Sequence, residues 1–149
     1  MTDDYSVTVR REIAARPEEL FDAWLDAQSL ATWFRPRGAR EAHAELDPRV
    51  GGAFRIVTVG DESSMVHAGT YQEIDRPRRL VFTWSSPATQ DRDSIVTVTF
   101  QPTSPGSTVV EIHQIGLPDD EARSLHHAGW SDVLHELGHT AHAETIADP

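Results

Sequence analysis

The chain has 149 residues, which is about the length of one domain and enough to bury a hydrophobic core. Acidic residues outnumber basic residues by 24 to 13, and the formal net charge is −11 at pH 7. Because nucleic-acid affinity depends on Lys and Arg side chains that neutralise phosphates, this charge argues against a DNA or RNA partner. The sequence holds no cysteine, which excludes disulfides, iron–sulfur clusters and thiolate zinc sites.

The N-terminal segment and the hydropathy pattern bear on the cellular location. Residues Met1 to Tyr5 contain no basic residue, and no apolar run of the kind found in a signal peptide follows them. No apolar stretch approaches the ~18 residues that a membrane-spanning helix needs. We therefore expect a cytoplasmic protein with no membrane partner, folded as a single domain over residues 1–149.

The first part of the chain predicts one strand and two helices. Residues Tyr5 to Ala14 alternate between apolar and polar side chains, which favours a strand. Pro17 is followed by two glutamates, a combination typical of a helix start, and the apolar stripe of this helix includes Trp24. A second, shorter helix is predicted from Ser29 to Phe34, ending before Pro36.

Short strands separated by turn signals follow. The predicted strands are Glu41 to Leu46, Ala53 to Val59, Met65 to Ile74, Arg79 to Trp84, Ser94 to Phe100 and Ser107 to Ile115. This spacing favours a meandering antiparallel sheet. Gly51 and Gly52 are typical of a tight turn, in which Arg49 is expected to pair with a nearby carboxylate.

The longest predicted helix starts at Pro118-Asp119-Asp120-Glu121 and runs to about His142 or Ala143. Its apolar residues lie on one face of a helix with about 3.6 residues per turn. They are Trp130, Val133, Leu137 and Ala141. An antiparallel sheet that curls around this helix is the simplest packing of the predicted elements, so we expect an α+β fold.

Residues 135–139 read His-Glu-Leu-Gly-His, the spacing with which two histidines of one helix bind zinc and a glutamate serves as the base. A zinc hydrolase also needs a third protein ligand, and no third histidine follows at the required spacing. On the predicted helix, His135, His139 and His142 lie opposite the apolar face, toward solvent. We expect neither a zinc hydrolase nor any cofactor; adventitious or inter-subunit metal binding by Asp132, His135 and His139 is the alternative.

The order of elements and several motifs resemble the helix-grip superfamily of START-like (SRPBCC) and pollen-allergen-like domains. Within it, the chain resembles the family named after the activator of the ninety-kilodalton heat-shock-protein ATPase. The matching stretches are Pro17 to Trp24 with Leu30 and Trp33; Asp47 to Phe54; His67 to Tyr71 with Ile74, Pro77 and Leu80 to Trp84; and Val96 to Phe100 with His113, Gly116-Leu117, Gly129-Trp130, Leu134 and Leu137.

This resemblance implies a curved seven-stranded antiparallel sheet around the C-terminal helix, two short helices between the first two strands, and an apolar pocket between sheet and helix. Members of the superfamily bind small hydrophobic molecules, and some relatives cyclise polyketides. The proteins that give the family its name stimulate a chaperone ATPase, but they are longer and carry an additional domain. A homodimer is plausible for the family.

The expected ligand site lies between the sheet and the last helix, because apolar walls with a few polar groups are typical of small-molecule sites. Its predicted residues are Trp33, Phe54, Ile56, Met65, His67, Tyr71, Phe82, Trp84, Val98, Trp130 and Leu134. A plain packed core is the alternative reading of the same aromatic residues. His67 and Tyr71 share one face of a strand and are the candidates for acid–base chemistry.

Three functions remain open at this point. The favoured one is a domain that binds a small hydrophobic or aromatic molecule, without turnover. The first alternative is an enzyme resembling a polyketide cyclase or hydrolase, which would use His67 or Tyr71 in the same pocket. The second alternative is a module that contacts a chaperone through its surface.

Overall fold

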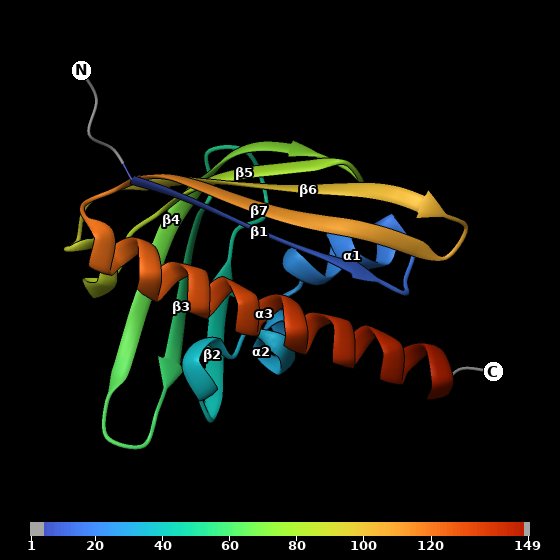
Figure 1. The fold of residues 1–149 in the computed structure, drawn as a ribbon, viewed down its shortest axis with the longest axis horizontal. Coiled ribbons are helices and arrows are strands. Elements are labelled where there is room, and N and C mark those ends of the chain that lie inside the picture. The colour runs from blue at the N-terminus through green and yellow to red at the C-terminus, as the bar shows by residue number, and fades with distance from the viewer. Residues whose placement is uncertain (1–4, 148–149) are drawn as a thin grey trace.

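A computed structural model describes residues 5–147, without the side chains of residues 37 and 142–147. One sheet of seven antiparallel strands curves around the helices (Figure 1). The strands are β1 (Tyr5–Ile13), β2 (Glu41–Leu46), β3 (Ala53–Val59), β4 (Ser64–Asp75), β5 (Arg79–Trp84), β6 (Ser94–Ser104) and β7 (Ser107–Leu117). The helices are α1 (Pro17–Trp24), α2 (Ala27–Trp33) and α3 (Asp120–Ala147), with short 3-10 turns η1 (Pro36–Gly38) and η2 (Pro87–Thr89).

The sheet is an open meander to which the first strand is added at one edge. Strands β2 to β6 each pair with the next strand in the chain, and β1 pairs with β7 at the opposite edge from β2. The α1–α2 segment therefore crosses from one edge of the sheet to the other. Helix α3 packs against β1, β7, α2 and both 3-10 turns, and Figure 1 shows it lying across the curved sheet. The predicted helix-grip α+β fold is confirmed.

Two helices begin at residues other than the predicted ones because aspartates cap them. Asp26 precedes α2, and its carboxylate accepts a hydrogen bond from the Gln28 backbone N–H at 3.1 Å, so the helix starts at Ala27 rather than Ser29. The Asp119 carboxylate likewise accepts from the Ala122 N–H at 2.9 Å, and α3 starts at Asp120 rather than Pro118. At the other end α3 continues to Ala147, beyond the predicted end.

Several strands are longer than predicted because their backbone pairing continues into the turns. Strands β6 and β7 pair as far as Ser104 and Ser107, on either side of Gly106, whose φ is +87°. Strand β7 also continues to Leu117, where it pairs with Tyr5. The turns η1 and η2 have no periodic pattern and were not predicted.

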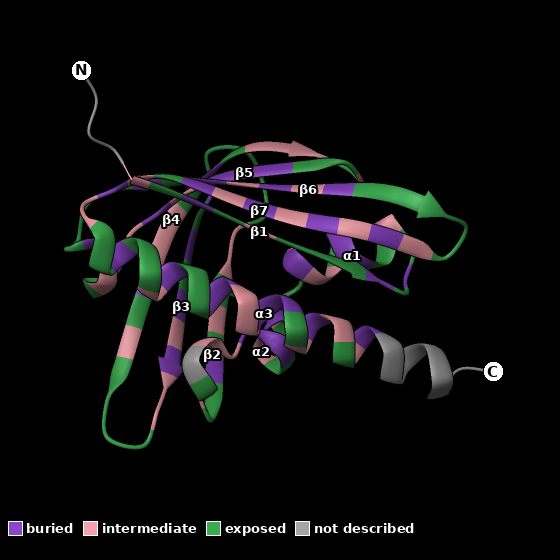
Figure 2. Ribbon diagram, viewed as in Figure 1, coloured by how far each residue is buried: buried purple, intermediate pink, exposed green. Residues whose placement is uncertain are grey.

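The predicted apolar face of the last helix packs into the core. Trp130, Val133 and Leu137 are at most 3% exposed, whereas His135 and His139 are exposed. Figure 2 shows the resulting alternation of buried and exposed residues along α3. The predicted direction of the two histidines is confirmed; the side chain of His142 lies outside the described residues.

Close backbone approaches require glycine at two positions. A Cβ on Gly52 would overlap the backbone of Asp47, and a Cβ on Gly69 would overlap the Thr83 carbonyl. In the same turn as Gly52, the Arg49 Nε lies 3.0 Å from Asp47 Oδ2, which is the expected ion pair. Among the described residues, no helix has the length and hydropathy needed to span a membrane.

Candidate functional site

A cavity of about 410 Å³ lies between α3, the strands β3 to β5 and the two 3-10 turns; we call it the α3 cavity. Its size lies within the ~300–1,000 Å³ typical of small-molecule sites. Its lining consists mainly of apolar and aromatic side chains. The lining residues are Phe34, Pro36, Thr58, Met65, His67, Trp84, Ser86, Ala88, Leu125, His126, Gly129, Trp130 and Val133.

One face of α3 forms a wall of the cavity, because its lining residues recur at helical spacing. His126, Trp130 and Val133 are successive residues of this face. Gly129 lies beside them and has no side chain. A Cβ at this position would come within 3.5 Å of the Pro36 Cβ, so the glycine keeps the space between α3 and η1 open.

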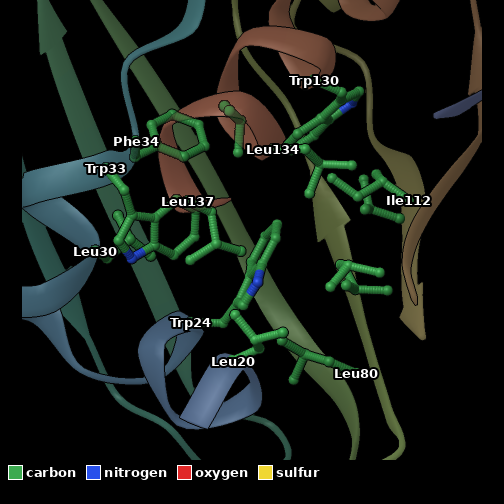
Figure 3. Close-up of a cluster of buried hydrophobic side chains, with 14 of the residues drawn as sticks. Leu20, Trp24, Leu30, Trp33, Phe34, Leu80, Ile112, Trp130, Leu134 and Leu137 are labelled. Atoms are coloured by element: carbon green, nitrogen blue, oxygen red, sulfur yellow. The ribbon is translucent and has the colours of Figure 1, made fainter. Parts of the chain in front are cut away.

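The aromatic wall is held by a buried chain of hydrogen bonds. The Trp84 and Trp130 rings lie 5.0 Å apart. The Trp130 indole N–H donates to Gln114 Oε1 at 2.7 Å, and Gln114 Nε2 donates to the Ser94 hydroxyl at 2.8 Å. That hydroxyl donates to the Trp84 carbonyl oxygen at 2.7 Å. Figure 3 shows Trp130, Leu134 and Phe34 gathered beside α3.

His67 contributes a buried, uncharged imidazole to the lining. Its ring stacks on Trp84 with the centroids 5.1 Å apart, and its Nε2 lies 3.1 Å from the Thr58 hydroxyl oxygen. Its Nδ1 is buried and has no hydrogen-bond partner among the described residues. Burial, with a smaller contribution from His126, lowers the pKa of His67 to about 4, so the ring is neutral at pH 7.

His126 contributes a second imidazole, and its proton position is defined by the helix. Its Nδ1 lies 2.7 Å from the Ala122 carbonyl oxygen. A carbonyl oxygen only accepts hydrogen bonds, so Nδ1 carries the proton and donates. Burial lowers the pKa of His126, so Nε2 holds a lone pair at neutral pH. The described residues that line the α3 cavity include no Asp, Glu, Lys or Arg.

A second gap, of about 20 Å³, lies deeper in the core and has room for about one water molecule. Phe34 and Trp84 line both spaces and therefore separate them. The aromatic rings around the inner gap pack tightly, as in Phe54 and Tyr71 with centroids 5.3 Å apart. Burial, with a contribution from the Asp47 charge, raises the pKa of Tyr71 to about 12.

The structure distributes the predicted site residues over three places. Met65, His67, Trp84 and Trp130 line the α3 cavity. Phe54, Ile56, Tyr71 and Phe82 line only the inner gap. Trp33, Val98 and Leu134 are at most 1% exposed and line neither space.

The candidate acid–base pair is not brought together in one cavity. His67 and Tyr71 point to the same side of β4, as their spacing predicts. They are four residues apart, however, and a strand rises about 3.3 Å per residue, so the two rings lie at different heights along it. His67 lines the α3 cavity, whereas Tyr71 lines the inner gap.

Several lining residues were missed by the sequence analysis. Helical spacing from Trp130 would have identified His126 and Val133, and strand alternation from Ile56 would have identified Thr58. Thr58 is also the register partner of Met65. The remaining missed residues lie at the helix ends and turns, or next to the helix face, where no simple pattern marks them: Phe34, Pro36, Ser86, Ala88, Leu125 and Gly129.

The His-Glu-Leu-Gly-His segment lies away from this cavity. His135 and His139 are exposed on α3, and the described residues contain no group of three His, Asp or Glu side chains arranged to hold a metal ion. His113 is on β7, where its Nδ1 lies 2.8 Å from the Thr8 hydroxyl oxygen.

Comparison with solved structures finds the same fold in several bacterial proteins. Protein CV1439 from Chromobacterium violaceum is 27% identical, with a TM-score of 0.78 over 92% of this chain and 97% of that chain. CalU16 from Micromonospora echinospora is 21% identical, with a TM-score of 0.70 over 95% and 79% of the two chains. This second likeness shows the fold alone.

A eukaryotic relative and a family model extend these similarities. PFC0360w, an HSP90 activator from Plasmodium falciparum, is 29% identical, with a TM-score of 0.60 over 76% of this chain and 74% of that chain. No curated protein matches the sequence. The family model described as "Activator of Hsp90 ATPase homolog 1-like protein" matches residues 14–142. The chain therefore belongs to the family of Activator of Hsp90 ATPase homolog 1-like proteins.

Proposed function

We propose that this protein is a cytoplasmic binding domain that holds a small, uncharged and mainly apolar molecule in the α3 cavity. The observation that supports this proposal is the cavity itself, with about 410 Å³ of space and a mainly apolar lining. A hollow of this size with mainly apolar walls, next to a tightly packed core, is consistent with a small-molecule site.

The charge pattern of the lining supports an uncharged ligand. Transfer of an ionised group from water to such a site is costly unless a partner of opposite charge is present. The lining residues that the structure describes include no carboxylate, guanidinium or amine, and burial holds both imidazoles neutral. A neutral molecule that buries apolar surface against Trp84, Trp130 and Val133 meets none of this cost.

The proposal can be tested with N-phenylnaphthylamine, an uncharged dye whose fluorescence rises in apolar surroundings. The dye is titrated into the purified protein, and we expect saturable binding of one molecule per chain. The Gly129→Leu variant places a side chain in the α3 cavity and should weaken dye binding at least roughly tenfold, because the site loses volume.

Gly138→Ala is the matched control on the same helix. A Cβ there would face Arg11 and Ile13, outside the cavity, so dye binding should be unchanged. Circular dichroism establishes that both variants keep the fold. Absence of saturable binding to the native protein, or equal binding by the native and Gly129→Leu proteins, would contradict a ligand site in the α3 cavity.

A second candidate function is contact with a chaperone of the Hsp90 class. It is supported by the 29% identity to the HSP90 activator from Plasmodium falciparum over 76% of this chain. The test is a pull-down with purified Hsp90 from the same organism, together with measurement of its ATPase rate. Chaperone binding that persists in the Gly129→Leu variant would place this function on the surface rather than in the cavity.

A further inference from the structure

We infer that the ligand of the α3 cavity is a neutral aromatic alcohol whose hydroxyl group donates a hydrogen bond to Nε2 of His126. This inference rests on the proposed function, since it specifies the chemical class of the bound molecule. Three features of the described residues support it: an acceptor nitrogen without a partner, the absence of charged lining residues, and the aromatic walls.

The first feature is the unpartnered acceptor. His126 is only 7% exposed, and its Nδ1–H is already donated to the Ala122 carbonyl oxygen. Nε2, at the far end of the ring, has no hydrogen-bond partner among the described residues. The described residues therefore leave this acceptor available to a molecule in the cavity. A ligand that donates to Nε2 takes the place of the hydrogen bond that water would otherwise make there.

The second feature limits the kind of donor. An ammonium group would donate to Nε2, but the described residues of the lining provide no carboxylate to balance its charge. A carboxylate accepts hydrogen bonds and would meet the lone pair of Nε2 with its own lone pairs. An uncharged hydroxyl group donates a hydrogen bond without bringing a charge into the cavity.

The third feature is the set of rings around the cavity. Phe34 lies 5.8 Å from Trp84 and 6.1 Å from Trp130, measured between ring centroids, and His67 stacks on Trp84. Flat aromatic molecules pack against such rings in offset or edge-to-face arrangements. A phenol-type hydroxyl on a fused-ring compound therefore matches both the walls and the acceptor.

The test compares β-naphthol with its methyl ether, which has the same rings but no O–H donor. Isothermal titration calorimetry of the native protein measures both dissociation constants. We expect the ether to bind roughly 2- to 12-fold more weakly, the range that corresponds to one net hydrogen bond. The comparison needs no change in the protein, so it does not depend on the folding of a variant.

Variants then test whether the preference for β-naphthol over its methyl ether depends on His126. In His126→Phe the preference for naphthol should disappear, whereas His126→Gln, which offers an amide oxygen as acceptor, should retain it. His135→Phe makes the same change on the exposed side of α3 and should leave the preference as in the native protein.

Each outcome separates this inference from the function on which it rests. Equal binding of the alcohol and the ether by the native protein would overturn the inference and leave a cavity that binds apolar molecules. A preference that survives in His126→Phe would overturn the role of Nε2. Failure of both compounds to bind, together with failure of N-phenylnaphthylamine, would overturn the inference and the proposed function.

Discussion

Removal of the buried His67 imidazole should make the protein less sensitive to acid. His67 is 7% exposed, its ring lies against Trp84, and burial lowers its pKa from 6.5 to about 4. In the unfolded chain the same imidazole takes up a proton near its ordinary pKa. Between pH 6.5 and about 4 the unfolded state therefore binds more protons than the folded state, and the free energy of unfolding falls as the pH is lowered.

The size of the effect follows from the two pKa values. They differ by about 2.5, and each pKa unit corresponds to about 1.36 kcal/mol. The stability that depends on a neutral His67 is fully present above pH 6.5 and is lost as the pH falls. At about pH 4 this loss amounts to about 3 kcal/mol. Typical domains are stable by only about 5–15 kcal/mol, so a loss of this size is measurable.

The assay is urea unfolding followed by tryptophan fluorescence, at about pH 7 and at about pH 4, for the native protein and the His67→Gln variant. Glutamine has no titratable group and can still hydrogen-bond to the Thr58 hydroxyl. The native protein should lose about 3 kcal/mol more than the variant between the two pH values.

The exposed His127 on α3 provides the matched control, as His127→Gln. Other groups also titrate over this range, so the prediction concerns the difference between the proteins rather than either curve alone. If the native and His67→Gln proteins lost the same stability, His67 would not be a buried neutral histidine in the folded state and would not supply a neutral imidazole to the cavity lining.

Three further substitutions test the packing. Gly69→Ala should cost about 1–3 kcal/mol or more, because its Cβ would overlap the Thr83 carbonyl; an unchanged Tm in a thermal melt would contradict this close approach. Gln114→Leu should cost about 1–3 kcal/mol in urea unfolding, because the Trp130 N–H loses its acceptor; unchanged stability would refute that role. Phe21→Ala should cost about 3–5 kcal/mol, because Phe21 is 0% exposed; a loss below about 1 kcal/mol in guanidinium unfolding would contradict its place in the core.

Local patterns in the sequence predicted the elements and their faces. Alternation in residues such as Val96, Val98 and Phe100 and the helical spacing of Trp130, Val133 and Leu137 depend only on backbone periodicity, which neighbouring residues determine. The side chains in both series are buried, as expected. For the same reason, helical geometry alone placed His135 and His139 toward solvent, although their spacing matches a zinc motif.

The ends of the helices and the positions of the turns depend on individual contacts, which a periodic sequence pattern does not reveal. Helix α2 begins at Ala27 because the Asp26 side chain reaches the Gln28 N–H, and η2 is held by hydrogen bonds between Ser86 and Thr89. Each of these hydrogen bonds joins one side chain to a nearby backbone group. The sequence therefore identifies residues that can form such a bond, but not whether the bond forms in the folded chain. The turns then supply two residues of the cavity, Ser86 and Ala88.

The sequence by itself determined the order of the elements, the buried face of α3 and the resemblance to a family, because all three depend on local patterns and their spacing. Only the tertiary structure decided where the free space lies. The predicted aromatic residues Phe54, Tyr71 and Phe82 fill the core, while the α3 cavity opens beside His126 and Gly129. The volume left between side chains depends on which residues of distant segments meet, and periodicity along one segment carries no information about that.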